Sequence, residues 1–257
     1  MQASIRDLGP YSTRNASKGA LLEETSRVID ALASGLTLDE VRKEALEGTL
    51  LQKSTLMNRR TVWRRIHFRL FTHGVDWVIN DFIDAYGYGP YSPEFISIIY
   101  LQYCLRDHMA YDFASEVIWN RYLEDRLLIS RHDILSFLDE ASDEQPTIMD
   151  WSDTTRRKVA TSTLTAFRDF GLLRGTQKKY ITQPPLPLFT AQHLLRILVS
   201  ERVKGMDIIN NKTWRLFLRS PGEVSNSLVE LGRENRIRYE RVGSTVVLET
   251  PVEWGSR

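Results

Sequence analysis

The residues of this chain that most clearly suggest a chemistry are its arginines and lysines. They are concentrated in segments that contain almost no acidic residues. Residues 48–75 contain no Asp or Glu. A guanidinium group stays charged at any relevant pH and binds phosphate through paired hydrogen bonds. A basic segment of this kind therefore predicts contact with a polyanion such as nucleic acid. Its six cations are Lys53, Arg59, Arg60, Arg64, Arg65 and Arg69.

A helix over residues 55–71 would arrange these cations around one apolar face. The arginines from Arg60 to Arg69 lie on its flanks and opposite side. We therefore expect the helix to dock by its apolar face and to direct its guanidinium groups outward. The alternative is a solvated helix whose arginines pair with the acidic segment that follows. The apolar residues at helical spacing are Val62, Trp63, Ile66 and Leu70.

The charge then alternates in sign along the chain, although the net charge is only +1. Residues 76–150 hold 15 acidic residues against 4 basic ones. Residues 154–200 reverse the balance, with 8 basic residues against the single Asp169. Segments of one sign create local fields that the total charge conceals, so we expect local surfaces to select the partners.

The second basic segment begins in the first turn of a predicted helix. Ser152 is a good N-cap residue for a helix over residues 153–170, and Gly171 is placed to end it. The first turn of this helix contains the three cations Arg156, Arg157 and Lys158. The helix dipole disfavours cations at this end, so their presence there indicates an external anion.

A small hairpin is predicted after this helix. Residues 172–173 and 180–182 are short, largely apolar segments that flank a basic turn containing Gly175, a pattern typical of a hairpin. Lys178 and Lys179 would lie at its tip and add a second set of phosphate contacts.

The same order of elements recurs further along the chain. Helices are predicted over residues 190–203, 207–218 and 220–234, and a hairpin over residues 236–241 and 244–250. Helices followed by a two-stranded hairpin are the layout of a winged helix. In such a module one helix enters the major groove and the hairpin contacts the adjacent backbone.

Six residues of this last unit are candidates for nucleic-acid contact, as groups able to reach phosphates or base edges. They are Ser225, Asn226, Arg233, Arg236, Arg238 and Arg241. Three acids on or next to the same helix, Glu223, Glu230 and Glu234, argue against dense phosphate contact there. A winged helix that binds protein is therefore the alternative for this unit.

The first 150 residues are predicted to be almost wholly helical and to form a bundle. Thr37 with Glu40 forms a capping-box pattern. Residues 92–94 place a cap residue, a first-turn proline and an acid that matches the dipole before another helix. Residues 111–125 are predicted to form the helix that follows it.

The expected fold is mainly α, with an N-terminal helical bundle followed by one or two winged-helix-like modules with small β-hairpins. The polar, acidic stretch over residues 139–150 is the predicted domain boundary. The domains are then the bundle at 1–145 and the winged-helix-like region at 146–257, with units at 151–183 and 189–252.

The sequence contains no pattern that indicates catalysis. It has no phosphate-binding loop, dinucleotide fingerprint, nucleophile elbow or HExxH motif. His108, Asp112 and Glu116 would share a helical face that a metal could use, but a solvated acidic face is the simpler interpretation in this acidic segment. We therefore expect no enzymatic activity, no cofactor and no metal.

Cys104 is the single cysteine and is expected to be buried, since it lies in the longest uncharged apolar run. That run covers residues 95–105 and is too short for a membrane span, which needs about 20 residues. The chain shows no charged-then-apolar leader. We therefore expect a cytoplasmic protein with no membrane partner.

Three stretches together resemble the BrxA family of bacterial BREX phage-defence systems, and the similarity covers most of the chain to about residue 200. The stretches are residues 17–25 (SKGALLEET), 41–70 (VRKEALEGTLLQKSTLMNRRTVWRRIHFRL) and 151–174 (WSDTTRRKVATSTLTAFRDFGLLR).

The resemblance implies a largely helical, non-enzymatic accessory protein that binds double-stranded DNA and acts beside other BREX defence proteins. Together with the basic segments, it makes duplex DNA, bound mainly through phosphates, the expected partner. Two alternatives stay open: a protein–protein assembly factor of the defence complex, and an RNA-binding protein similar to helical antitermination factors.

Overall fold

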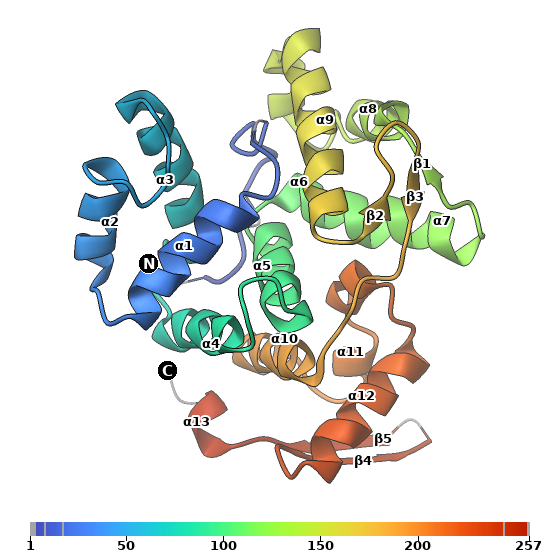
Figure 1. Cartoon of the computed structure of the whole chain (residues 1–257). Helices are drawn as coiled ribbons and strands as arrows, with labels where there is room; N and C mark the ends of the chain where they lie inside the picture. The colour runs from blue at the N-terminus through green and yellow to red at the C-terminus, as the bar shows by residue number, and fades with distance from the viewer. Residues whose placement is uncertain (1–3, 8, 17, 244, 256–257) are drawn as a thin grey trace.

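The structure is a computed structural model that is mainly α-helical, with strands only in small antiparallel sheets (Figure 1). This confirms the predicted fold class. Ser17 and Ser244, at which a sequence motif and a predicted strand begin, lie outside the described residues. The structure describes residues 4–7, 9–16, 18–243 and 245–255.

Five helices form the N-terminal part of the molecule. Of these, α5 runs through the centre (Figure 1) and packs against α3 and α4. Ten of its 13 residues are buried, because a helix that is apolar on every side is stable only inside a core. The five are α1 (Leu22–Ala33), α2 (Leu38–Leu46), α3 (Leu56–Leu70), α4 (Asp76–Gly87) and α5 (Pro93–Leu105).

Local sequence signals determine where these helices begin. The Thr37 N–H donates to the Glu40 carboxylate at 2.8 Å, and the Thr37 hydroxyl accepts the Glu40 N–H, which confirms the capping box ahead of α2. Ser92 accepts the Phe95 N–H at 3.1 Å and caps α5. Each cap satisfies a backbone group that the first turn leaves unpaired.

The helix that follows is continuous but not α-helical throughout. The α-helix predicted over residues 111–125 is replaced by α6, a π-helical segment η1, and α7. A π-helix has i→i+5 hydrogen bonds, so Phe113 and Ile118 lie on one face, and both are fully buried. The elements are α6 (His108–Asp112), η1 (Phe113–Ile118) and α7 (Trp119–Leu123).

The middle of the chain forms a three-stranded antiparallel sheet with two helices. The strand order is β1–β3–β2, and the hairpin of β2 and β3 confirms the one predicted after residue 171. Helices α8 and α9 pack against each other. The elements are β1 (Leu128–Ile129), α8 (Arg131–Glu140), the 3-10 turn η2 (Pro146–Asp150), α9 (Asp153–Asp169), β2 (Leu173–Arg174) and β3 (Lys179–Ile181).

These elements pack together across residues 139–150, where the sequence places a domain boundary. Leu128 of β1 lies opposite Tyr180 of β3 in the sheet. The unit therefore begins before residue 128 rather than at residue 151. The two-residue strand β1 was not predicted, because two residues are too short to show alternation.

The C-terminal part contains helices and a second hairpin. The helix predicted over residues 207–218 is wrong: α11 and the 3-10 segment η3 replace it. The Asn211 side chain accepts the Thr213 N–H at 3.0 Å and starts a new turn there. The elements are α10 (Leu188–Ser200), α11 (Met206–Ile209), η3 (Lys212–Phe217), α12 (Pro221–Arg233), β4 (Arg238–Val242), β5 (Thr245–Glu249) and α13 (Val252–Gly255).

One hydrophobic core runs through all three parts of the molecule. Tyr100, Phe167 and Trp214 come from the N-terminal, middle and C-terminal parts, and each is fully buried. The Tyr100 hydroxyl donates to the Leu216 carbonyl at 2.9 Å. The hydroxyl is therefore satisfied within the core, and it joins α5 to η3.

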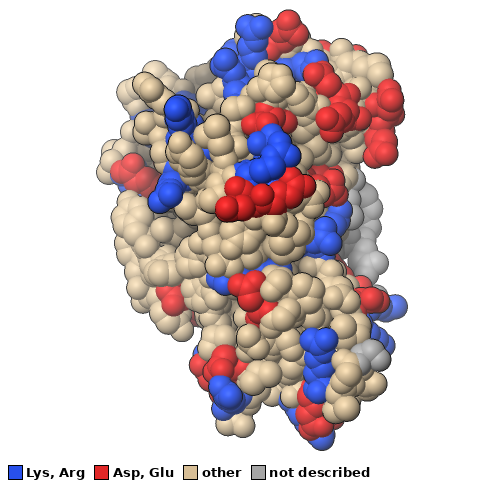
Figure 2. Space-filling model, turned by 90° about the vertical axis from the view of Figure 1, so that its right-hand side faces the viewer, with Lys and Arg blue, Asp and Glu red and all other residues tan. Residues whose placement is uncertain are grey.

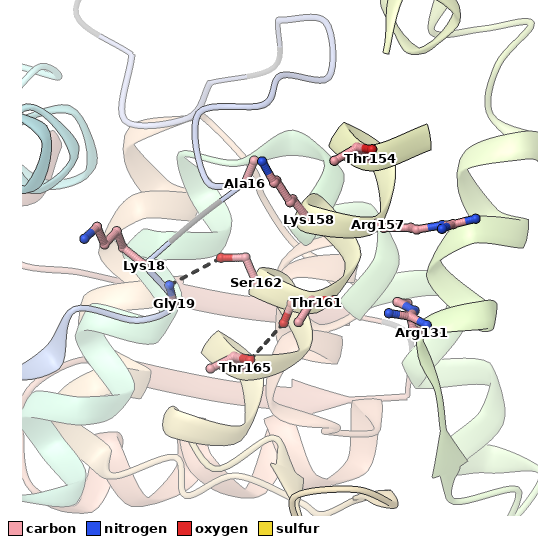
Figure 3. A pocket seen from close by; sticks show the side chains of 10 residues that line it. All are labelled: Ala16, Lys18, Gly19, Arg131, Thr154, Arg157, Lys158, Thr161, Ser162 and Thr165. Atoms are coloured by element: carbon pink, nitrogen blue, oxygen red, sulfur yellow. Dashed lines mark hydrogen bonds between the residues drawn. The ribbon is translucent and has the colours of Figure 1, made fainter. Parts of the chain in front are cut away.

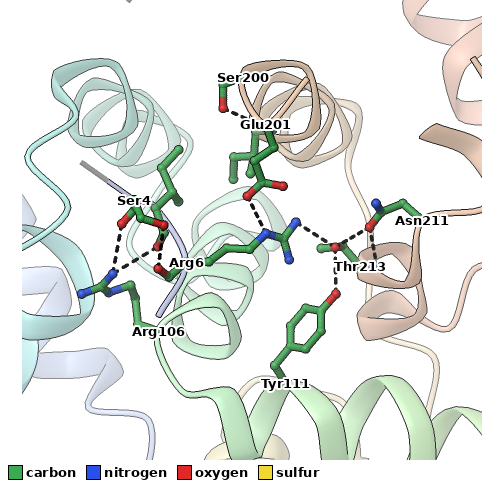
Figure 4. A network of polar contacts seen from close by, with 10 residues as sticks. Ser4, Arg6, Arg106, Tyr111, Ser200, Glu201, Asn211 and Thr213 are labelled. Carbon is green, nitrogen blue, oxygen red and sulfur yellow. Dashed lines mark hydrogen bonds and ion pairs between the residues drawn. The ribbon is translucent and has the colours of Figure 1, made fainter. Parts of the chain in front are cut away.

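A largely buried polar network joins the N-terminal segment, α6 and the C-terminal part (Figure 4). The Arg6 guanidinium bonds to Glu201 and, at 3.0 Å, to Thr213. The Thr213 hydroxyl lies 3.0 Å from that of Tyr111 in α6. The N-terminal segment therefore connects the start of the chain to its last quarter.

Candidate nucleic-acid interface

Helix α9 has one buried face and one exposed face. Ser152 accepts the Thr155 N–H at 3.2 Å and caps the helix as predicted. Gly171, with φ at 84°, lies just past its end in the left-handed conformation that glycine favours. Side chains such as Val159 and Phe167 pack into the core. The opposite face carries polar and basic side chains.

An open groove of about 610 Å³ follows the exposed face of α9. The N-terminal loop lies on one side of the helix and Arg131 of α8 on the other (Figure 3). No acidic residue lines this groove in the described part of the chain. The lining residues are Ala16, Lys18, Gly19, Arg131, Thr154, Arg157, Lys158, Thr161, Ser162 and Thr165.

The cations of this groove flank α9 on both sides. Lys18 and Lys158 lie toward the N-terminal loop, whereas Arg157 points toward Arg131 (Figure 3). All four are exposed, and none forms an ion pair or side-chain hydrogen bond with another described residue. Four uncompensated cations around a groove favour the binding of an anion.

Arg156 does not share this position, although the sequence groups it with its two neighbours. It is half-buried and forms an ion pair with Asp139 of α8. Successive residues on a helix lie about 100° apart, so Arg156 faces α8 while Arg157 and Lys158 face the groove.

A second groove, of about 520 Å³, lies between α2 and α3. Arg60 and Arg64 of α3 are exposed in it, with Arg42 of α2, and Asp39 is the acid of its lining. His67 also lines it, and burial, reinforced by the charge of Arg42, lowers the pKa of this histidine. The lining of this groove therefore carries net positive charge, but unlike the lining of the α9 groove it includes an acidic residue.

The acidic segment does not neutralise these two arginines. Within the part of the chain that the structure describes, no salt bridge joins Arg60 or Arg64 to an acid. Acids of that segment pair elsewhere, as Asp133 does with Arg121 and Asp112 with His108. The alternative that the exposed arginines of α3 are internally paired is therefore wrong for these two.

The expectation that Arg69 points outward is also wrong. Its side chain is buried, with 3 % of the residue exposed. It donates to Asn15 Oδ1 at 2.6 and 3.0 Å, and to the carbonyls of Gly19 and Ala20. Arg69 therefore holds the loop that borders the α9 groove.

The remaining cations of α3 and its approach are also engaged or partly covered. Arg59 donates to the Lys53 carbonyl at 3.3 Å, and the Lys53 ammonium pairs with Glu24 at 2.6 Å. Arg65 is half-buried, and burial together with Arg64 lowers its pKa. Of the six predicted cations, only Arg60 and Arg64 are exposed, and the others are half-buried or buried.

At the tip of the β2–β3 hairpin the two predicted lysines differ. Lys178 is exposed, whereas the Lys179 ammonium donates to the Thr176 carbonyl at 2.7 Å. Lys178 is therefore the cation of this tip that is open to a phosphate.

Most basic residues predicted in the C-terminal unit have acidic partners. Arg238 lies 3.1 Å from Glu240 and 3.0 Å from Glu249. Arg233 pairs with Glu230, and Arg236 with Glu234. These pairs leave little net charge on α12 and the β4–β5 hairpin.

The other three candidates of this unit are polar or bonded to backbone. Arg241 donates to the Gly243 carbonyl at 3.2 Å. Ser225 shares a hydrogen bond of 2.7 Å with the Tyr239 hydroxyl, and Asn226 is exposed. The face seen in Figure 2 likewise shows acidic and basic side chains interspersed rather than one patch of either sign.

Three cations of the two grooves were not predicted: Lys18, Arg42 and Arg131. Arg131 lies in the segment with the large acidic excess, and Lys18 lies far from the basic segments in the sequence. Counting charge along the chain hides such residues, because the fold brings them to α9 and α3 from other segments. The capping box of Ser130 and Asp133 marks the start of α8 in the sequence and so places Arg131 in its first turn, but it does not show that α9 lies beside it.

The structure bears on two further expectations. None of the helices in the described ranges combines the length and apolarity that crossing a bilayer requires. His108 and Asp112 pair with each other at 3.1 Å, and the described residues contain no group of three side chains suited to a metal ion.

Comparison with known proteins places the chain in a family. A crystal structure of an uncharacterized protein from Magnetospirillum magneticum is similar in fold, with a TM-score of 0.62 and 14% sequence identity. The match covers 82% of this chain and 100% of that one. No curated protein matches the chain. The family model of BrxA matches residues 9–197, well over half of the sequence, and the chain therefore belongs to the BrxA family.

Proposed function

We propose that this protein is a non-enzymatic accessory protein of a bacterial BREX phage-defence system that binds double-stranded DNA mainly through phosphate contacts. The observation that carries the proposal is the groove along α9, which has four uncompensated cations and no acid in its lining. Lysine and arginine contacts to phosphate supply most non-specific DNA affinity. Membership of the BrxA family supports a role beside other BREX proteins.

The order of elements in the middle unit supports a winged-helix interpretation. A helix, a short strand, two more helices and a hairpin follow one another from α7 to β3. In a winged helix the last of the three helices enters the major groove and the hairpin contacts the adjacent backbone. Here those elements are α9 and the hairpin that carries Lys178.

Fluorescence anisotropy with a labelled DNA duplex at two salt concentrations tests the proposal. The affinity of the wild-type protein should fall steeply with salt, with a slope of about −0.9 per phosphate contacted. The double variant Arg157→Glu, Lys158→Glu should bind at least about tenfold more weakly and show a slope smaller by about two.

Lys204→Glu is the matched control, because Lys204 is exposed but lies outside both grooves. It should leave the affinity within about twofold. If the wild-type protein binds no duplex at low salt, the proposal is refuted. If it binds and the double variant binds equally well, the α9 groove is not the interface.

A specific observation keeps the assembly-factor alternative for the C-terminal unit. On its hairpin Arg238 is paired with two acids and Arg241 donates to a backbone carbonyl, whereas Val242 and Val247 are 79% and 41% exposed. Such a surface suits a protein partner better than phosphate. Co-purification with other BREX proteins after nuclease treatment would favour this function. Competition between duplex DNA and structured RNA would separate DNA binding from RNA binding.

A further inference from the structure

We infer that α9 reads base edges in the major groove, so that binding depends on sequence as well as on phosphate charge. The inference rests on the proposed function and extends it to the choice of DNA. It is based on a line of hydrogen-bonding side chains on the exposed face of α9, formed by Thr154, Arg157 and Thr161. All three line the groove.

The spacing of these residues matches the repeat of a duplex. Positions 154, 157 and 161 follow one line along a helix. At 1.5 Å per residue they span about 10 Å, which is about three base-pair steps of 3.4 Å. One line of side chains can therefore face about three successive base pairs.

Their chemistry suits bases better than it suits phosphates alone. Arginine can bond guanine O6 and N7 together, and threonine can bond a base edge or contact the thymine methyl group. The Arg157 guanidinium and the hydroxyls of Thr154 and Thr161 form no hydrogen bond with other described residues. Phosphate binding alone needs positive charge, which a threonine does not supply.

Threonine has a local cost at position 161, in the interior of α9. It is a weaker helix former there than alanine, glutamate or lysine, and at an exposed site no packing compensates for this. Thr154 and Thr161 are both exposed. Thr161 on the open face of α9 is therefore better explained by contact with a ligand than by helix stability.

The segments next to α9 limit how far this helix can enter the major groove of DNA. The Gly19 N–H donates to Ser162 Oγ at 3.3 Å, so the N-terminal loop lies against the helix at this point. Thr154, Arg157 and Thr161 lie on the part of α9 that precedes Ser162, and Ala16 of the loop lies near Lys158 on one flank of this part (Figure 3). Lys18 on one flank and Arg131 on the other are then placed to contact the phosphates that border the major groove (Figure 3).

Selection from a duplex library with a randomised segment, using the full-length protein, tests the inference. The selected pool should be enriched in a short motif of about three base pairs that includes a guanine. Arg157→Ala should lower discrimination at that guanine by about 5- to 150-fold. Arg157→Lys keeps the charge but loses the bidentate geometry, so it should lose the discrimination and retain the salt dependence.

Lys18→Ala provides the contrasting variant. As a phosphate ligand, Lys18 should affect all sequences equally, so its removal weakens binding without changing the motif. Thr154→Val and Thr161→Val keep the side-chain shape and remove the hydroxyl, and each should relax preference at one position.

The outcomes separate this inference from the proposed function. If the wild-type protein binds duplex DNA but the pool shows no enrichment, base readout is refuted while duplex binding stands. If a motif appears and Arg157→Lys leaves it unchanged, α9 is not the reader. If no duplex binds at all, the proposed function fails, and the inference fails with it.

Discussion

At the scale of single residues, two arginines of the same intrinsic chemistry have opposite environments. Arg157 is exposed beside the groove, whereas Arg69 is buried and bonded to Asn15 and to two backbone carbonyls. The sequence predicts phosphate contact for both. Residue type and spacing identify a cation but not its partner, and the partners of Arg69 lie about 50 residues away in the chain.

Arg69→Ala should lower the free energy of unfolding by about 2–4 kcal/mol, because buried acceptors lose their donors. Arg69→Lys should recover less than half of that loss, since lysine cannot reproduce the planar fork. Urea denaturation measures both. Arg64→Ala, at an exposed position of the same helix, is the control and should change stability by less than about 0.5 kcal/mol. Equal losses in the two alanine variants would contradict the structure.

His108 should make stability depend on pH. Its hydrogen bond to Asp112 raises the pKa of the imidazole, while burial and Lys212 oppose the shift. A histidine whose pKa is raised on folding contributes stability that is complete below the unfolded value of about 6.5 and is lost as pH rises through the folded pKa. Urea unfolding should therefore show that His108→Gln destabilises the protein more at about pH 6 than at about pH 8.5. An equal loss at both values would refute this role.

At the scale of elements, the starts of helices are predicted correctly where side chains close in the sequence determine them. Caps at Thr37, Ser92 and Ser152 locate the starts of three helices, because side chains within three residues satisfy the first backbone groups. Strand β1 could not be predicted from its own two residues, because its pairing with Tyr180 and Lys179, 50 to 52 residues later, makes it a strand. The α9 groove could not be predicted, since it is formed by segments far apart in the chain, and the second groove depends on how the consecutive helices α2 and α3 pack.

The C-terminal hairpin and helix α9 should contribute unequally to DNA binding. The double variant Arg238→Ser, Arg241→Ser should lower duplex affinity by less than about threefold, because Arg238 already lies between two carboxylates and exposed pairs contribute little field. Arg157→Ser, Lys158→Ser should lower it by more than about tenfold. Anisotropy at one moderate salt concentration measures both double variants. A larger loss from the C-terminal hairpin would reverse the assignment of the interface.

At the scale of the whole molecule, one core crosses the domain boundary that the sequence predicts. The polar composition of residues 139–150 is typical of a linker, but β1 before it pairs with β3 after it. Composition describes the solvent exposure of a segment and not what its neighbours contact. The predicted boundary therefore marks an exposed connection within a packed unit.

Fragments 1–145 and 146–257, produced separately, should not unfold cooperatively in urea, because each would expose core surface that the other covers. The full chain should show a single transition by circular dichroism and by tryptophan fluorescence. If either fragment gave a sharp transition of its own, the division into domains at residue 146 would be correct.

The bonds of Arg6 also have a consequence for the synthesis of the protein. Its partner Glu201 follows 195 residues later in the chain. At about 5–20 residues per second on the ribosome, Glu201 is added to the chain about 10–40 s after Arg6. The bond between Arg6 and Glu201 therefore forms late in translation, whereas Arg69, which bonds the loop around Lys18, is made about 50 residues after that loop.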